Sequence, residues 1–326
     1  MNVTVLGDGA WGTALANLLC QNGNAVTLWG HDAAQLENVR RAGRNDLFLP
    51  GILLSPELKY EADLARAVAA AECVVVAVPS KFLREVTARI PSFHGIAVSV
   101  TKGIEDQSGL TMTGVLKETM PRCVAAALSG PSFALEVARG VPGAIVAAHA
   151  DGRVAKKIQV LFHGATFRVY TSSDVLGVEL GGAIKNVVAI AAGIGDGLGF
   201  GDNTKAALIT RAMAEIRRLG VAGGACAETF SGLSGLGDLT ATCFSRLSRN
   251  RNFGERVGRG EKVEAILAST VAVAEGYPTA RSAHHLAGRL GIETPIVREV
   301  YAMLYENKNI RQAVQSLMAR DMKPED

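Results

Sequence analysis

Three glycines near the start of the chain have the spacing needed to bind a pyrophosphate. Gly7, Gly9 and Gly12 stand in GDGAWG, between the apolar run VTVL and the helix-like segment TALANLLCQNG. In such a loop the first glycine permits a tight turn, the second lets the backbone approach the phosphates, and the third allows close packing of helix on strand. The free N–H groups that begin the helix attract the anion. An ordinary tight turn also uses glycine, but the strand–loop–helix context favours a dinucleotide site.

Two ionisable side chains follow the second predicted strand, which ends in TLWG. At this place dinucleotide-binding proteins contact the adenosine ribose. His31 could contact a 2′-phosphate, whereas Asp32 could accept a hydrogen bond from a 2′-hydroxyl. Asp32 could equally cap the next helix. We expect NADP or NAD as the cofactor, with NADPH favoured.

A lysine inside an apolar helical segment is a candidate for proton transfer. Lys185 lies in VLGVELGGAIKNVVAIAAGIG, where burial and a neighbouring cation such as Lys102 would lower its pKa. Reduction of a ketone by hydride needs such a donor at the carbonyl oxygen. Asn186 and Asp238 could orient the lysine, although Asp238 in GLGD could also be a turn former. The alternative for Lys185 is a solvated lysine on an amphipathic helix.

The run SRLSRNRNFG at 245–254 combines guanidinium groups with short polar side chains, as a phosphate site requires. A solvated charged stretch would have the same composition. Gly130 and Ser132 follow the predicted strand CVAAALS at the start of a helix, an end that attracts anions. Lys102 follows the strand GIAVSV, so it emerges at the sheet edge where ligands of doubly wound folds bind.

Two kinds of region must position these groups. Up to about residue 170, apolar strand-like runs alternate with Ala-rich helical stretches, which predicts an α/β domain with a doubly wound, Rossmann-type parallel sheet. Beyond it, long apolar patterns at helical spacing predict an all-helical C-terminal domain. SSD at 172–174 offers a helix cap at the boundary. We therefore predict a dinucleotide-binding domain at 1–173 and a helical substrate and catalytic domain at 174–326.

Composition excludes several classes of protein. The 326 residues carry 34 basic and 31 acidic side chains without a charged block, which argues against nucleic acid binding. Five scattered cysteines with no metal-ligand spacing suggest a reducing compartment and no metal site. The opening MNVTVLGDGA resembles a strand rather than a secretion signal, and the apolar runs are too short for stable membrane insertion. We expect a soluble, cytoplasmic protein.

Across nearly its whole length the chain resembles the bacterial NAD(P)-dependent glycerol-3-phosphate dehydrogenases. The matching segments are GDGAWGTALA at 7–16, NDLFLPG at 45–51, AVPS at 77–80, SVTKGIE at 99–105, LSGPSFALEV at 128–137, ELGGAIKNVVAIAAGI at 179–194, LSGLGDLTATC at 233–243, SRNRNFG at 248–254 and VAEGYPTA at 273–280.

The resemblance implies that Lys185 is the catalytic acid–base. It implies that the substrate lies among Lys102, Gly130, Ser132, Lys185, Asp238, Ser248, Arg249 and Asn250. It also implies that the cofactor touches Gly7, Gly9, Ala10, Trp11, Gly12, His31, Lys102, Ala134, Arg249, Val273 and Glu275. Family members often carry a hydroxyl residue where this chain has Ala10, so only backbone N–H groups would serve the pyrophosphate there.

The implied activity is reversible reduction of dihydroxyacetone phosphate to sn-glycerol 3-phosphate by NAD(P)H. Its product would supply glycerophospholipid synthesis, and the resemblance implies a homodimer. Two alternatives stay open from the residues: another dehydrogenase that pairs a dinucleotide domain with a helical one, and a dinucleotide-binding sensor without turnover. The sensor would leave Lys185, Asp238 and Arg249 without a purpose.

Overall fold

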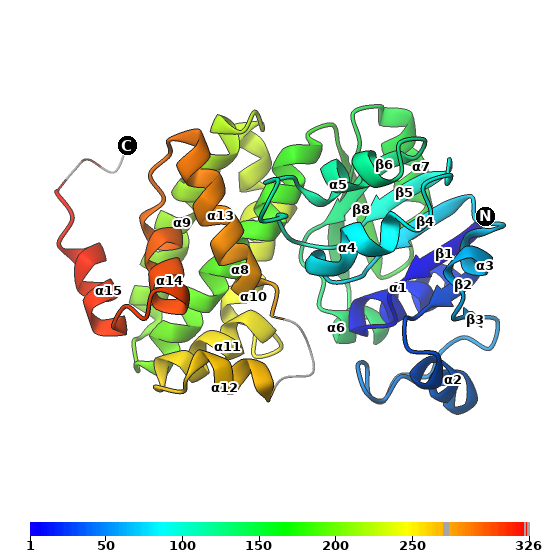
Figure 1. Cartoon of the computed structure of the whole chain (residues 1–326), viewed down its shortest axis with the longest axis horizontal. Coiled ribbons are helices and arrows are strands. Elements are labelled where there is room, and N and C mark those ends of the chain that lie inside the picture. Colours follow the sequence, from blue (N-terminus) through cyan, green and yellow to red (C-terminus); the bar gives the residue numbers. More distant parts are fainter. Residues whose placement is uncertain (270–273, 323, 325–326) are drawn as a thin grey trace.

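The structure is a computed structural model that describes residues 1–269, 274–322 and 324. A sheet-containing half and a helical half lie side by side, with the N-terminus on the first and the C-terminus at the far end of the second (Figure 1). The predicted order of an α/β region followed by an all-helical region is confirmed.

One eight-stranded sheet forms the first half, in the order β3-β2-β1-β4-β5-β6-β7-β8. Neighbouring strands are parallel except β6 and β7, so the last two strands run opposite to the rest. The prediction of a doubly wound parallel sheet is confirmed for the six strands from β3 to β6 in this order, whereas the reversed pair of β7 and β8 departs from it. The strands are β1 (Asn2–Leu6), β2 (Ala25–Trp29), β3 (Lys59–Glu61), β4 (Cys73–Val76), β5 (Ile96–Ser99), β6 (Val124–Ser129), β7 (Gly143–Ala148) and β8 (Phe167–Ser172).

Helices cover both faces of this sheet, which explains its uniformly apolar strands. All four residues of β4 are buried, and successive ones join opposite cores: Cys73 and Val75 on one face, Val74 and Val76 on the other. The helices of this half are α1 (Ala10–Gln21), α2 (Ala33–Ala42), α3 (Leu64–Val68), α4 (Ser80–Thr87), α5 (Met112–Thr119), α6 (Ala134–Ala138) and α7 (Gly152–Phe162).

The helical half is built around α8 (Val175–Gly197), whose N-terminus is capped by Asp174 as the SSD segment predicted. By length and composition α8 could cross a membrane, but 83% of its most apolar window is buried inside the protein. Around it lie α9 (Asp202–Ala222), the 3-10 turn η1 (Ala227–Ser231), the π-helical turn η2 (Leu233–Gly237), α10 (Asp238–Phe244), α11 (Arg249–Gly258), α12 (Val263–Ala268), α13 (Gly276–Leu290), α14 (Pro295–Tyr305) and α15 (Ile310–Met318).

A buried carboxylate joins the halves. Glu179 on α8 accepts hydrogen bonds from the Thr111 hydroxyl at 2.7 Å and from the Thr113 N–H at 2.8 Å, at the start of α5. An isolated buried carboxylate would be costly, and these donors compensate it. The contact fixes α8 against the sheet and so sets the position of any side chain on α8 that faces the sheet's carboxyl edge.

Candidate active site

Two lysines share one buried aspartate where the halves meet. Lys185 Nζ lies 2.8 Å from Asp238 Oδ1, and Lys102 Nζ lies 2.7 Å from Asp238 Oδ2. Lys185 is only 6% exposed and Asp238 only 2%. The solvated-lysine alternative for Lys185 is therefore wrong. The arrangement holds two ammonium groups close together with one counter-charge between them.

Each member of this group comes from a different element. Lys185 projects from the middle of α8, Lys102 from the loop after β5, and Asp238 is the first residue of α10. The π-helical turn that leads into α10 is a geometry that often occurs at functional sites. Thr242, one turn further along α10, receives a hydrogen bond from Lys185 Nζ at 2.6 Å and donates to the Asp238 carbonyl.

The buried charges shift one another's ionisation. Burial lowers the pKa of Lys185 to about 8, against the opposing effect of Asp238, and Lys102 lowers it further. Burial alone would raise the pKa of Asp238, but the two lysines outweigh it and hold that pKa below its ordinary value. Lys185 can thus give or take a proton near neutral pH, and Asp238 stays ionised.

Lys102 also reaches the turn that follows β6. Its Nζ donates to the Gly130 carbonyl at 2.9 Å and contacts the Ser132 hydroxyl at 3.1 Å. The Ser132 hydroxyl donates to the same carbonyl at 2.8 Å. The structure therefore brings together Lys102, Gly130, Ser132, Lys185 and Asp238, five residues that the resemblance had assigned to substrate binding.

The segment from Arg246 to Arg251 separates into three environments. Arg246 is exposed without an ion pair among the described residues, as a solvated charge would be. Arg251 pairs with Asp196 at 2.6 Å and is largely buried. Arg249 begins α11, is exposed, and has no carboxylate within ion-pair distance in the described ranges. Of the three guanidinium groups, only that of Arg249 is both free and adjacent to the buried cluster through its neighbour Asn250.

Asn250 is occupied within the protein. Its amide donates to Asn186 Oδ1 at 2.8 Å and accepts from the Gly276 N–H at 2.8 Å, which ties α8, α11 and α13 together. Ser248 caps α11 by accepting from the Arg251 N–H. Asn186 adjoins Lys185 in the chain, so these bonds place the start of α11 next to the lysine.

The glycine loop fits a dinucleotide pyrophosphate. Gly7 has φ +113°, which a residue with a side chain rarely adopts, and a Cβ on Gly12 would overlap the Gly7 carbonyl. Gly9 precedes α1 without capping it by a side chain, so the first N–H groups of α1 face the loop unobstructed. A Cβ on Gly9 would meet nothing, so the space above the loop is open.

The other cofactor candidates lie around this loop or between the halves. Trp11, like Ala10, is in the first turn of α1, and α6, which begins with Ala134, packs against α1. His31 is exposed at the end of β2. Glu275 accepts from the Ser80 N–H and hydroxyl at 2.9 and 2.5 Å, which links α13 to α4. Val273 lies outside the described residues.

Asp32 caps a helix, which is one of the two roles predicted for it. Its Oδ1 accepts from the N–H groups of Ala34 and Gln35, so it caps α2. Whether it also contacts a ribose stays a prediction.

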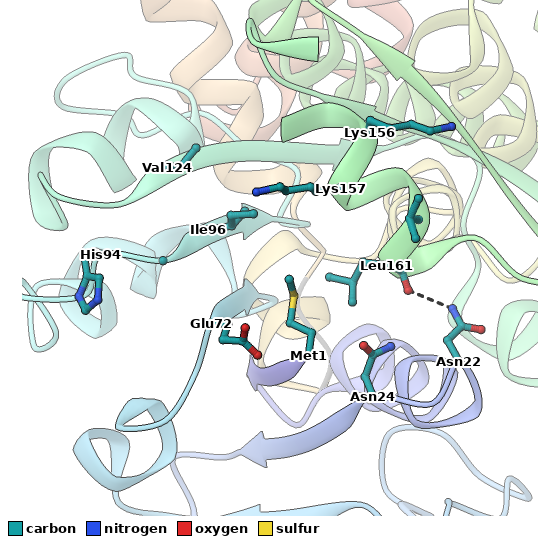
Figure 2. A pocket seen from close by; sticks show the side chains of 12 residues that line it. Met1, Asn22, Asn24, Glu72, His94, Ile96, Val124, Lys156, Lys157 and Leu161 are labelled. Carbon is teal, nitrogen blue, oxygen red and sulfur yellow. Dashed lines mark hydrogen bonds between the residues drawn. The ribbon is translucent and has the colours of Figure 1, made fainter. Parts of the chain in front are cut away.

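A hollow elsewhere in the sheet-containing half is not the site. It has a volume of about 630 Å³ and is lined by residues that immediately precede strands, among them Met1, Glu72 and Gly95, and by Lys156 and Leu161 of α7 (Figure 2). It therefore lies at the amino edge of the parallel strands, whereas doubly wound folds bind ligands at the carboxyl edge.

Three polar residues in or near the site were missed or left undecided by sequence reasoning. Thr242 was not distinguishable from a turn residue until the structure placed it on Lys185. Ser80 became a candidate only through its bonds to Glu275, 195 positions away. Asp8 carried a usable signal, since a charged side chain inside a glycine-rich phosphate loop is unexpected.

Comparisons with known proteins cover almost the whole chain. Residues 2–155 match the family described as NAD-dependent glycerol-3-phosphate dehydrogenase N-terminus, and residues 174–315 match the corresponding C-terminus. NAD(P)+ glycerol-3-phosphate dehydrogenases of Anaeromyxobacter dehalogenans and Syntrophotalea carbinolica are 51% and 50% identical, covering 100% of this chain and 100% and 99% of theirs. The crystal structure of glycerol-3-phosphate dehydrogenase from Coxiella burnetii has a TM-score of 0.94 at 36% identity, covering 98% of this chain and 99% of that one.

Proposed function

The chain belongs to the NAD(P)-dependent glycerol-3-phosphate dehydrogenase family, and we propose that it reversibly reduces dihydroxyacetone phosphate to sn-glycerol 3-phosphate with NAD(P)H. The observation that carries the proposal is the buried group of Lys185, Asp238 and Lys102 at the carboxyl edge of the sheet, on the side where the glycine loop also lies. It offers a proton donor and a second cation to a ketone oxygen.

In this reaction each polar residue of the group has a separate role. When bound, the nicotinamide supplies the hydride that is added to the carbonyl carbon of the ketone. Lys185 donates its proton to the carbonyl oxygen, while the charge of Lys102 stabilises negative charge that develops there. Asp238 holds both ammonium groups in place, and Thr242 orients Lys185 through its hydroxyl. In the reverse direction Lys185 accepts the proton of the alcohol.

Arg249 is the proposed phosphate ligand. Its guanidinium is free of internal ion pairs among the described residues, and it stands at the N-terminus of α11, whose dipole also favours an anion. We assign Ser248 and Asn250 to the same part of the site. Gly130 and Ser132 would position the glycerol portion beside Lys102.

For the cofactor we propose Gly7, Gly9, Ala10, Trp11 and Gly12 around the pyrophosphate. The rest of the dinucleotide would be surrounded by Lys102, Ala134, Arg249, Val273 and Glu275. Lys102 and Arg249 are also proposed for the substrate, so they would lie between cofactor and substrate. His31 at the end of β2 supports a preference for NADPH, and Asp32 is already engaged as a helix cap. Comparing kcat/KM for NADPH and NADH tests that preference, and a clear NADH preference would refute it.

Assembly and location are proposed on the family relationship. We propose a homodimer in the cytoplasm whose product feeds glycerophospholipid synthesis. Light scattering after gel filtration tests the dimer, since a monomer mass at micromolar concentration would contradict it.

The direct test follows NAD(P)H absorbance with dihydroxyacetone phosphate and with a panel of other ketones, including unphosphorylated dihydroxyacetone and 2-oxo acids. We expect rapid oxidation only with the phosphorylated ketone. Faster turnover of a 2-oxo acid would identify a different dehydrogenase. Binding of the dinucleotide without turnover of any ketone would identify a sensor.

A further inference from the structure

Asp8 places an acidic side chain in the glycine loop itself, between Gly7 and Gly9. The residue is only 7% exposed. Its backbone carbonyl is used within the protein, because it accepts from the Thr13 hydroxyl and the Asn45 amide. The side-chain carboxylate does not take part in these bonds and is turned toward the end of the neighbouring strand β2.

The position of the carboxylate follows from its contact with Gly30. A Cβ built on Gly30 would lie 2.6 Å from Asp8 Oδ2 and 2.7 Å from Asp8 Cγ, so the carboxylate occupies the space that a side chain would fill. Gly30 follows β2 directly, and the Gly7 N–H donates to the Trp29 carbonyl at 2.9 Å. The carboxylate therefore lies at the carboxyl end of β2, where doubly wound proteins bind the adenosine ribose.

This carboxylate is largely buried, and the one hydrogen bond it receives among the described residues comes from its own backbone N–H. No other residue in the described part of the chain donates a hydrogen bond to it or pairs with it, although the charges of His31 and Asp32 act on it. Burial raises the pKa of Asp8, and the hydrogen bond from its own backbone N–H and the charge of His31 oppose this effect without outweighing it. Asp32 differs, because its carboxylate is exposed and accepts from two backbone N–H groups. Asp8 therefore has free acceptor capacity at the ribose end of the proposed cofactor site.

We propose that Asp8 is a specificity-determining residue that accepts a hydrogen bond from the ribose 2′-hydroxyl of NADH and repels the 2′-phosphate of NADPH. It thereby opposes the preference that His31 creates, and the balance of the two side chains sets how strongly NADPH is favoured. This inference rests on the proposed use of NAD(P)H but not on the identity of the ketone.

The test compares the dissociation constants of NADPH and NADH by titration calorimetry in the unaltered protein and in Asp8→Asn. Asparagine keeps the size of the side chain and removes its charge. We expect the ratio Kd(NADH)/Kd(NADPH) to rise about tenfold, because repulsion of the 2′-phosphate at close range disappears. His31→Ala should move the same ratio in the opposite direction.

The matched control is Glu57→Gln, which removes one negative charge from an exposed position before β3. It should leave the ratio unchanged. If Asp8→Asn alters the ratio by less than twofold, or no more than Glu57→Gln does, the proposal is wrong. Should Asp8→Asn fail to fold, as judged by its thermal denaturation, Asp8→Ser is measured against the same criterion.

Calorimetry needs no ketone, so the outcome is independent of the proposed reaction. Absence of turnover with dihydroxyacetone phosphate would overturn the proposed function and leave the ratio measurable. Normal turnover with an unchanged ratio in the Asp8 variants would overturn the inference and leave the function intact.

Discussion

The glycine loop and the buried lysine group are built in contrasting ways. The loop comes from one continuous segment, Gly7 to Gly12, and offers mainly backbone N–H groups at an open helix end. The lysine group collects Lys102, Lys185 and Asp238 from three elements and holds them by charged hydrogen bonds, with Lys185 and Asp238 buried and the Lys102 side chain 15% exposed. One region is local and made of backbone, whereas the other is assembled from distant side chains.

The difference corresponds to two tasks. Binding a pyrophosphate requires partial positive charges, which the backbone N–H groups at the start of a helix supply. Moving a proton requires a titratable group whose pKa is lowered toward neutrality, and only burial beside other charges achieves that. Damage to the loop should therefore weaken binding, and damage to the lysine group should slow the chemical step.

The strongest separation of the two regions is expected from Lys185→Met. The loss of the proton donor should lower kcat by about a hundredfold to ten-thousandfold, the usual contribution of general acid–base catalysis. The Kd of the dinucleotide should stay within about twofold, because the loop is untouched. Steady-state kinetics and calorimetry measure the two quantities, with the exposed Lys262→Met as control. A large loss of dinucleotide affinity would contradict the separation.

Arg249→Ala should chiefly affect the phosphorylated substrate. Removal of its charged hydrogen bonds costs roughly 1.5–3 kcal/mol, which raises KM for dihydroxyacetone phosphate by about tenfold to a hundredfold. The slow reaction of unphosphorylated dihydroxyacetone should change little. Arg246→Ala is the matched control, since Arg246 is an exposed arginine of the same segment. An unchanged KM in Arg249→Ala would show that the phosphate of the substrate binds to other residues.

Gly12→Ala tests the glycine loop, as Lys185→Met tests the lysine group. The added methyl group would overlap the Gly7 carbonyl, and the resulting shift of the turn should cost about 1–3 kcal/mol. We expect weaker binding of NADPH and NADH by similar factors, with kcat at saturating cofactor nearly preserved. Gly152→Ala is the control, because a Cβ at this first residue of α7 meets no atom of the protein and lies outside the glycine loop. Equal losses of affinity in the two variants would show that the close packing is unimportant.

The smallest expected effect is a shift of the pH at which kcat/KM begins to change. This shift sharpens the assignment of Lys185 as the proton donor. Reduction needs the ammonium form, so its rate should be level at low pH and fall about tenfold per unit above about 8. Oxidation needs the neutral amine and should rise through the same pH. Asp238 raises the pKa of Lys185, so Asp238→Asn should move the break to lower pH. Glu57→Gln should leave the break in place.

Much of the sheet-containing half was predictable because its strands are buried on both faces. Runs such as CVVV and VAAALS have no other plausible structure between Ala-rich helices, and both became strands. The strand β3 was missed because KYE is short, partly exposed and charged. The reversed direction of β7 and β8 was also not predictable, because an apolar strand has the same composition in either direction.

The sequence alone determined the glycine loop, the alternation of strands and helices, and the cap that begins α8, because each depends on residues within a few positions of one another. Only the tertiary structure decided that Asp238 lies between Lys102 and Lys185, that Arg249 rather than Arg251 is free, and that Asp8 faces Gly30. These contacts join positions that can lie more than a hundred residues apart, and their energies depend on burial and distance, which local pattern does not specify.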